Sequence, residues 1–332
     1  MIKTSLQLSL LVLLFPVLAT AQKTTQSQPG TARTTKTITV PLKAESWIFR
    51  ENKVQFLEYK SRPSLKILPE AGPVVLKNLD FTDGTIEFDH EPINPSFASM
   101  YFHCQDEKEN ECFYFRTGRA DNPTAVDAVQ YAPYLDGVNL WDLLDHYQGP
   151  AHFSKQSWNH VKLVISGKQM RVYVNSERKP TLEIPRLEGN ATHGTIAFDG
   201  EAIISNLVIK PNQTQGLSPG AGIDPTDHDP RYLRNWQVSQ PTLIPKGIDF
   251  SQDLVPGKET AWQAIEAERR GLINLTRPTA KAKPAGSSGS KLQSSRNWPR
   301  SDGWTSALVM KCGYRSTASF CTWIKTTIAN PS

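Results

Sequence analysis

The chain has 332 residues, enough for about two domains, and its 24 prolines, 20 glycines and 38% hydrophobic residues suit a loop-rich β protein. Its formal net charge of +5 comes from the C-terminal part, because nine basic residues and one acid, Asp302, lie from Arg277 onward. The preceding residues therefore carry a net charge of −3. The positive net charge therefore gives no support for nucleic-acid binding by the part predicted to fold, because phosphate binding needs a clustered basic face on a folded surface.

Residues 1–21 have the pattern of a signal peptide. Lys3 supplies the positive charge, Leu8–Leu18 the short apolar run, and an Ala-Thr-Ala sequence ending at Ala21 the cleavage site. We expect cleavage after Ala21 and a secreted or periplasmic protein, in a compartment where disulfides can form. The apolar run is too short to span a membrane and no later run qualifies, so no membrane span is predicted. Residues 22–38 form a polar linker rich in Thr, Gln and Ser.

From Thr39 onward, short strand patterns recur with turn signals between them, which predicts an all-β antiparallel sandwich. The clearest hairpin runs from Trp158 to Pro180, with Gly167-Lys168 as its tight turn. The predicted strands are 39–42, 47–49, 54–59, 64–68, 74–76, 84–90, 97–105, 111–117, 125–131, 160–166, 169–175, 181–184, 194–199 and 202–210.

A second hairpin is predicted at Tyr101–Arg119, where two aromatic-rich runs flank a charged turn at 106–110. Pairing its arms about Lys108 places Cys104 opposite Cys112, and by the same register Phe102 opposite Tyr114 and Tyr101 opposite Phe115. The two cysteines then form either a cross-strand disulfide or a pair of packed thiols.

Five sequence segments follow one another in an order that is informative about the fold. They are GTIEFD at 84–89, YFR at 114–116, VQY at 129–131, WNHVKLVISG at 158–167 and GTIAFDG at 194–200. With these segments, residues 39–211 resemble a concanavalin A-like lectin/glucanase jelly roll, in the laminin-G-like branch found in secreted bacterial proteins. That family includes glycan-binding modules, 3-keto-disaccharide hydrolase-type domains and glycoside hydrolases. The resemblance therefore implies the fold and leaves binding and catalysis both open.

The remaining chain divides into three parts. Residues 212–231 are a linker rich in Gly, Pro, Asp and Ser. Residues 232–276 are similar to the first strands of a galactose-binding-like β-sandwich, and are too short to close one. Residues 277–332 are basic and irregular, with one strand pattern at 322–328. We interpret the second module as truncated, through a frameshift or premature stop. The alternative is a disordered basic extension.

Three acids at alternate positions, Glu87, Asp89 and Glu91, share one face of a predicted strand. Jelly-roll glycosidases use such an acid row, because retaining hydrolysis needs two carboxyls about 5 Å apart. The competing interpretation is an early, half-exposed strand with solvated acids that ends at Pro92, and we favour it.

A second candidate site combines hydrogen-bonding and aromatic side chains. In the family that the chain resembles, the YFR and VQY strands lie side by side toward the concave sheet. Arg and Gln offer donors for sugar hydroxyls, and Tyr or Trp offers a flat face for a pyranose ring. The alternative is structural use, with the arginine paired to an acid and the aromatics in the core. The predicted ligand-binding residues are Arg116, Gln130, Tyr131, Trp141 and His146, with Tyr134 and His152 nearby.

The histidines show no metal-ligand spacing, so no zinc site is predicted. The resemblance to laminin-G-like domains implies that calcium is possible at acidic turns, although turn formation alone also explains these residues. The turn residues concerned are Asp83, Asp136, Asn139, Asp199 and Glu201. We therefore expect an exported, non-catalytic glycan-binding or accessory domain that needs no cofactor. The alternative is a glycoside hydrolase or 3-keto-disaccharide hydrolase-like enzyme that acts at the concave face.

Overall fold

The computed structural model describes residues 36–176, 178–240, 242–245, 259–275, 292–293, 305–314 and 318–328. The predicted signal peptide and all of its linker except its last residues lie outside these ranges. Within the described residues, no helix is both long and apolar enough to cross a membrane.

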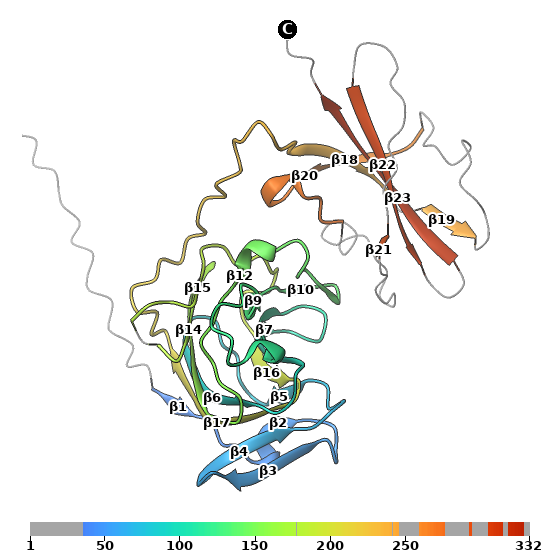
Figure 1. Cartoon of the computed structure of the whole chain (residues 1–332). Coiled ribbons are helices and arrows are strands. Elements are labelled where there is room, and N and C mark those ends of the chain that lie inside the picture. The colour runs from blue at the N-terminus through green and yellow to red at the C-terminus, as the bar shows by residue number, and fades with distance from the viewer. Residues whose placement is uncertain are drawn as a thin grey trace, which may run out of the picture. The chain divides into compact units, whose positions relative to one another are not determined.

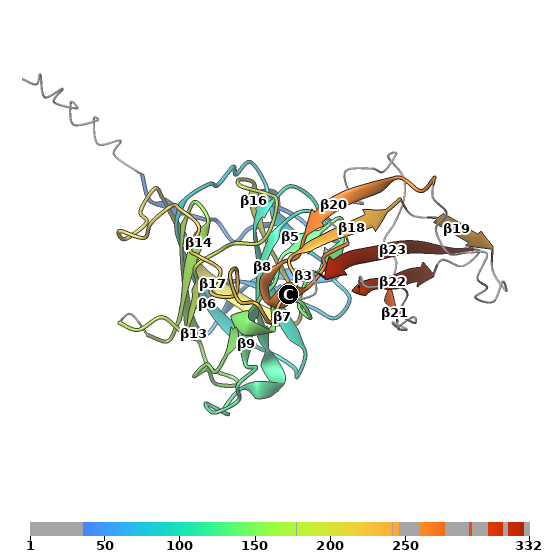
Figure 2. The same cartoon turned by 90° about the horizontal axis from the view of Figure 1, so that it is seen from above.

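Two antiparallel sheets form a β-sandwich, which confirms the predicted fold class; Figures 1 and 2 show the two layers. The eight-stranded sheet runs β15 (Leu182–Ile184), β14 (Gln169–Val174), β13 (Asn159–Ser166), β6 (Gly84–Pro92), β17 (Ala202–Pro211), β4 (Arg62–Ile67) and β3 (Val54–Tyr59), and β1 (Ile38–Thr39) pairs with β17. The seven-stranded sheet runs β12 (Gln148–Gly149), β9 (Val129–Tyr131), β8 (Glu111–Arg116), β7 (Phe97–Cys104), β16 (Thr195–Asp199), β5 (Val74–Leu76) and β2 (Trp47–Ile48). A small ladder joins β10 (Tyr134–Leu135) to β11 (Val138–Asn139), and 3-10 helices lie at Ala44–Ser46, Thr117–Arg119, Asp145–Tyr147 and Arg269–Gly271.

The period-2 pattern of the strands builds the core between the sheets. In β13, Val161, Leu163 and Ile165 are fully buried in the core, while Lys162, Val164 and Ser166 point to the outer face of the sheet, because successive side chains of a strand point to opposite faces. The large side chains of Trp47 and Phe198 meet them from the other sheet, each with at most 2% of its surface exposed. Burial of so much apolar surface is the main stabilising contribution to this half of the chain.

The hairpin of β7 and β8 exists, but its predicted register is wrong. Tyr101 pairs with Cys112, and Phe102 with Glu111, a shift of three positions. His103 has a positive φ of 48°, so β7 leaves β8 after Phe102, while Cys104 goes on to pair with β16. The turn is therefore wider than predicted. Both cysteines are free thiols, and they are not cross-strand partners, since Cys112 pairs with Tyr101 and Cys104 with Thr195.

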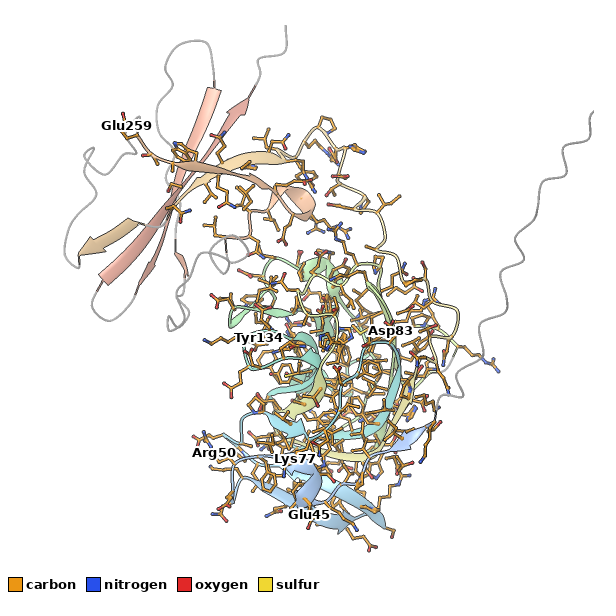
Figure 3. The ribbon with its side chains drawn as sticks, turned by 180° about the vertical axis from the view of Figure 1, so that it is seen from behind. Glu45, Arg50, Lys77, Asp83, Tyr134 and Glu259 are labelled. Carbon is orange, nitrogen blue, oxygen red and sulfur yellow. The ribbon has the colours of Figure 1, made fainter. Side chains whose placement is uncertain are left out.

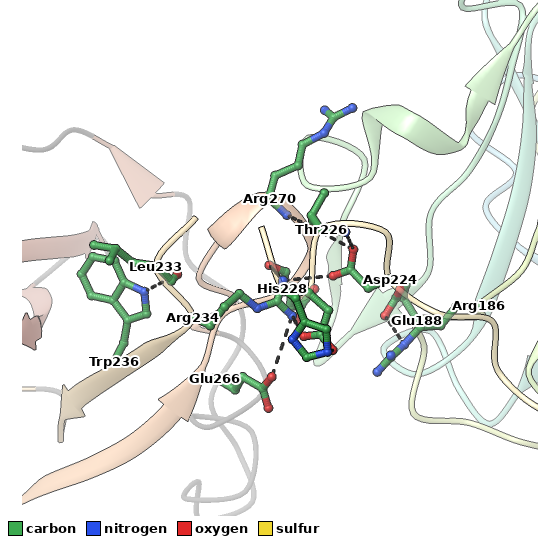
Figure 4. A network of polar contacts seen from close by, with 12 residues as sticks. Arg186, Glu188, Asp224, Thr226, His228, Leu233, Arg234, Trp236, Glu266 and Arg270 are labelled. Atoms are coloured by element: carbon green, nitrogen blue, oxygen red, sulfur yellow. Dashed lines mark hydrogen bonds and ion pairs between the residues drawn. The ribbon is translucent and has the colours of Figure 1, made fainter. Parts of the chain in front are cut away.

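A separate sheet forms after the jelly roll. It runs β20 (Trp262–Glu266), β18 (Asn235–Ser239), β23 (Ala318–Ile328), β22 (Thr305–Tyr314) and β21 (Leu292–Gln293), with β19 (Thr242–Pro245) paired to β23. The predicted strand at 322–328 lies within β23, whereas β22 was not predicted from the sequence and lies in the segment interpreted as irregular. Arg234 begins this module with an ion pair to Asp224 at 3.0 Å, and the backbone N–H of Arg270 donates to Thr226 (Figure 4).

Candidate functional site

The outer face of the seven-stranded sheet carries the candidate site, and we call it the groove face. On β8, Phe113 and Phe115 point into the core, so Cys112, Tyr114 and Arg116 point to the groove face. The predicted neighbours YFR and VQY do lie side by side as β8 and β9, with Tyr114 paired to Gln130. The expected adjacency of these two strands is therefore confirmed.

A row of polar side chains crosses the groove face at one level of the sheet. Asp199 on β16 pairs with Ser99 on β7, which pairs with Tyr114 on β8. The row continues through Gln130 on β9 to Gln148 on β12. Four strand pairings thus align five hydrogen-bonding side chains across the sheet, because residues directly opposite in register share a face.

Beside this row lies a groove of about 580 Å³. Its walls come from β5, β7, β10, β16 and the turn between β7 and β8. The aromatic walls are Tyr101 and Tyr134, whose ring centroids lie 5.9 Å apart at an angle of 75°; Figure 3 labels Tyr134. The remaining lining residues are Pro73, Val75, Cys104, Gln105, Asp106, Glu107, Lys108, Asn110, Thr195 and Asp199. The combination of flat aromatic rings with a few polar groups is typical of small-ligand sites.

Asp199 is the carboxylate at the end of the groove. One of its oxygens accepts a hydrogen bond from the N–H of Gly200 at 2.7 Å, and the other lies 3.5 Å from the hydroxyl of Tyr101, which donates to it. Gly200 has a φ of +91°, and an added Cβ there would collide with the carbonyl oxygen of Phe97, so only glycine fits the turn that orients Asp199. Burial raises the pKa of Asp199 above its ordinary value.

The predicted pair Arg116 and Gln130 is present, and the two residues are bonded to each other. Nη2 of Arg116 donates to Oε1 of Gln130 at 2.7 Å, and the Tyr114 hydroxyl donates to the same oxygen at 2.7 Å. The amide nitrogen of Gln130 donates to the carbonyl oxygens of Trp141 and Leu144. Gln130 is fully buried, so it ties the 141–144 loop to the sheet and does not offer its amide to a ligand.

The structure separates Tyr131 and His146 from the groove face. Tyr131 points into the core, where its hydroxyl donates to Glu111 at 2.6 Å and accepts from the N–H of Glu188 at 2.7 Å. The His146 ring is buried against Tyr147, and burial lowers its pKa to about 4. Both were predicted as ligand-binding residues. Tyr131 points into the core because it follows Gln130 on the same strand, and consecutive strand residues face opposite sides. His146 points inward from the 3-10 helix Asp145–Tyr147.

Trp141 and His152 lie outside the groove lining. The indole of Trp141 is 57% exposed on its loop, and its backbone carbonyl makes the bond to Gln130. His152 contributes its backbone carbonyl to Asn175. Neither residue lines the groove.

The acid row of Glu87, Asp89 and Glu91 lies on β6, in the middle of the other sheet. The predicted early, half-exposed strand is therefore a central one, and its acids are paired and not solvated. Glu91 accepts from Tyr59 at 2.9 Å and from Lys60 at 2.7 Å. The row belongs to the eight-stranded sheet, whereas the YFR and VQY strands belong to the seven-stranded sheet.

The carboxylates of Asp89 and Glu87 also have charged or hydrogen-bonding partners. Asp89 accepts from Arg62 and Asn206, and its second oxygen lies 2.9 Å from Nδ1 of His160. Although burial raises the pKa of Asp89, these hydrogen bonds lower it below its ordinary value overall. Glu87 pairs with Lys210 at 2.9 Å. The row is thus a set of structural ion pairs.

Two of the turn residues that suggested calcium make local hydrogen bonds. Asp83 accepts from Gly167, and Asn139 accepts from the N–H of Trp141, each within its own turn or contact. Throughout the described ranges, no three His, Cys, Asp or Glu residues lie together in a way that could hold a metal ion.

Sequence reasoning missed Tyr101 and Tyr114 as groove-face residues, and it named Asp199 only as a turn acid. The wrong hairpin register concealed them. Alternation was the available signal, since Tyr101 and Tyr114 stand at positions of opposite parity to the core residues Phe102 and Phe113.

Comparison with solved structures finds several that are similar to part of this chain. No family model and no curated protein matches the chain. The chain is similar to a carbohydrate-binding module, CBM66 from Bacillus subtilis, with 10% identity and a TM-score of 0.37 over 50% of this chain and 96% of that one. A β-glucanase from Bacillus licheniformis gives 12% identity and a TM-score of 0.38 over 55% and 100%. A Bacillus subtilis protein of unknown function with a galectin-like fold gives 15% identity and a TM-score of 0.37 over 52% and 93%. Likenesses at this level assign no ligand and no activity.

Proposed function

We propose that the jelly roll of this chain binds a carbohydrate in the groove between Tyr101 and Tyr134, as an exported, non-catalytic module. The observation that supports this best is the groove itself. It joins two aromatic side chains to the polar row that Asp199 begins, on one face of a rigid sheet. A pyranose ring presents an apolar face to an aromatic ring and hydroxyls to carboxylate and amide groups, so this pairing suits a sugar.

The arrangement of carboxylates supports binding over cleavage. Hydrolysis of a glycosidic bond requires two carboxyls about 5–10 Å apart across the substrate. The described strands of the seven-stranded sheet carry two acids, of which Glu111 is buried in the interior and Asp199 faces the groove. A glycoside hydrolase or 3-keto-disaccharide hydrolase-like enzyme would have to pair Asp199 with an acid of the β7–β8 turn, Asp106 or Glu107. We keep that as the alternative function.

A glycan array with the full-length chain, combined with a hydrolysis assay on the same glycans, tests the proposal. We expect binding to a restricted set of glycans without release of reducing sugar. Replacement of Tyr134 by Ala should weaken that binding about tenfold, because an aromatic contact contributes about 1–1.5 kcal/mol. Tyr59→Ala, on the eight-stranded sheet, is the matched control and should bind like the parent. Sugar release that stops in Asp199→Asn would establish the enzyme instead.

A further inference from the structure

The groove is negatively charged. Its lining includes the carboxylates of Asp106, Glu107 and Asp199, against the single ammonium of Lys108. The nearest strand-borne guanidinium on the groove face, that of Arg116, already donates to the carbonyl of Asp127 and to the sheet's own amide network. The lining residues therefore sum to a net charge of about −2 at neutral pH.

The pKa values of two groups in the groove are raised in part by this negative charge. Burial raises the pKa of Asp199, and the negative charge of Glu107 raises it further. Burial also raises the pKa of the Cys104 thiol, to about 11, and the charges of Asp106 and Glu107 add to that effect. Burial is the larger cause of both pKa shifts, and the smaller contribution of the acidic side chains is the repulsion expected between like charges.

The aromatic rings that line the groove also favour a cation over an anion. The rings of Tyr101 and Tyr134 meet edge to face and both line the groove, at a corner between the two rings. The face of an aromatic ring carries negative quadrupole charge and attracts an ammonium group. The Tyr101 hydroxyl donates toward Asp199, so that the carboxylate stands at one end of this corner. A cation in the corner would therefore contact both aromatic and anionic groups.

We propose that the groove selects a glycan whose sugars carry a free, protonated amine, a 2-amino-2-deoxyhexose chain, over the N-acetylated, hydroxylated or carboxylated counterparts. The inference rests on the proposed glycan binding and specifies its ligand. The sugar rings pack on Tyr101 and Tyr134, and the ammonium group lies toward Asp199 and Glu107. A uronate or sulfated sugar would bring a second negative charge into the same groove and is disfavoured.

Three β-1,4-linked tetramers provide matched probes, because they differ only at C2. The glucosamine tetramer carries an ammonium group there, the N-acetylglucosamine tetramer an amide and the glucose tetramer a hydroxyl, and a galacturonate tetramer supplies the anionic case. We would titrate each into the full-length chain by calorimetry at low and at high salt. We expect the glucosamine tetramer to bind about tenfold more tightly than the glucose tetramer at low salt, and to lose most of that advantage at high salt.

Two variants that each remove one negative charge test whether the groove carboxylates cause the preference for glucosamine. Asp199→Asn and Glu107→Gln should each weaken glucosamine binding about threefold to tenfold more than they weaken glucose binding. Glu58→Gln, an exposed acid on the other sheet, is the control. If Asp199→Asn does not fold, Glu107→Gln in the exposed turn still decides the matter.

The outcomes separate this inference from the proposed function. Equal affinity for the glucosamine and glucose tetramers would overturn the amine preference while glycan binding stands. A preference that survives both charge variants would also overturn it, since the selectivity would lie elsewhere. Absence of binding to every glycan on the array would refute the proposed function itself.

Discussion

Glu111 is a carboxyl in the interior of the sandwich, and its replacement tests the electrostatic account of the fold. The side chain has no exposed surface. One oxygen accepts from Tyr131 at 2.6 Å. Burial raises the pKa of Glu111 from 4.5 to about 7, although the hydrogen bond from Tyr131 and the charge of Lys168 act in the opposite direction.

This pKa makes the stability of the domain depend on pH in a definite direction. Between pH 4.5 and about 7 the folded chain keeps the proton on Glu111, while the unfolded chain has lost it. Because the folded state binds more protons in this window, the free energy of unfolding falls as the pH rises and levels off above about 7. The shift from 4.5 to about 7 corresponds to a loss of about 3 kcal/mol.

Glu111→Gln removes the titration and retains an oxygen that can accept from Tyr131. We expect the variant to lose the fall of about 3 kcal/mol that the parent shows, and so to be the more stable protein at pH 8. Urea unfolding of both proteins at a series of pH values, followed by tryptophan fluorescence, measures this. Glu58→Gln, at an exposed position, should keep the pH profile of the parent. Parallel pH profiles for the parent and Glu111→Gln would refute the reasoning.

Three further predictions follow from the geometry of the groove face. Gly200→Ala should destabilise the domain by at least about 2 kcal/mol, because alanine resists a positive φ; an unchanged unfolding midpoint would contradict the tight turn described at this position. Gln130→Leu should cost about 2–4 kcal/mol in urea unfolding, because it removes the acceptor of Arg116 Nη2 and the donor to the loop carbonyls, and a neutral effect would mean that water replaces them. Alkylation of the unreduced, denatured chain should label both Cys104 and Cys112, whereas a peptide that links the two would restore the disulfide.

The strand positions were predictable from sequence because alternation and turn residues are local signals. The strands at 54–59 and 74–76 have the predicted bounds, and the hairpin around Gly167 has the predicted turn. Register was less predictable, since it depends on how the turn folds. Asp106 accepts from the N–H groups of both Lys108 and Glu109, and this wider turn moves the pairing by three positions. An odd shift moves side chains to the opposite face.

The candidate site was predictable in part. The sequence located the strands that carry it and named Arg116 and Gln130, which the fold does bring together. It could not show that they satisfy each other, because that depends on a rotamer and on the loop at 141–144. Gln130 and Tyr131 could not both face one ligand, since they are consecutive on a strand. The groove joins side chains from β7, β10 and β16, and sequence alone does not specify such contacts.

Calorimetric titration of the best glycan from the array into a Tyr101→Ala/Tyr134→Ala variant tests the central claim most directly. Loss of both aromatic walls should weaken binding by about a hundredfold, or about 2–3 kcal/mol, while Tyr59→Ala on the other sheet binds like the parent. Thermal unfolding of each variant confirms that it is folded. Undiminished binding by a folded double variant would contradict the account and place the carbohydrate outside this groove.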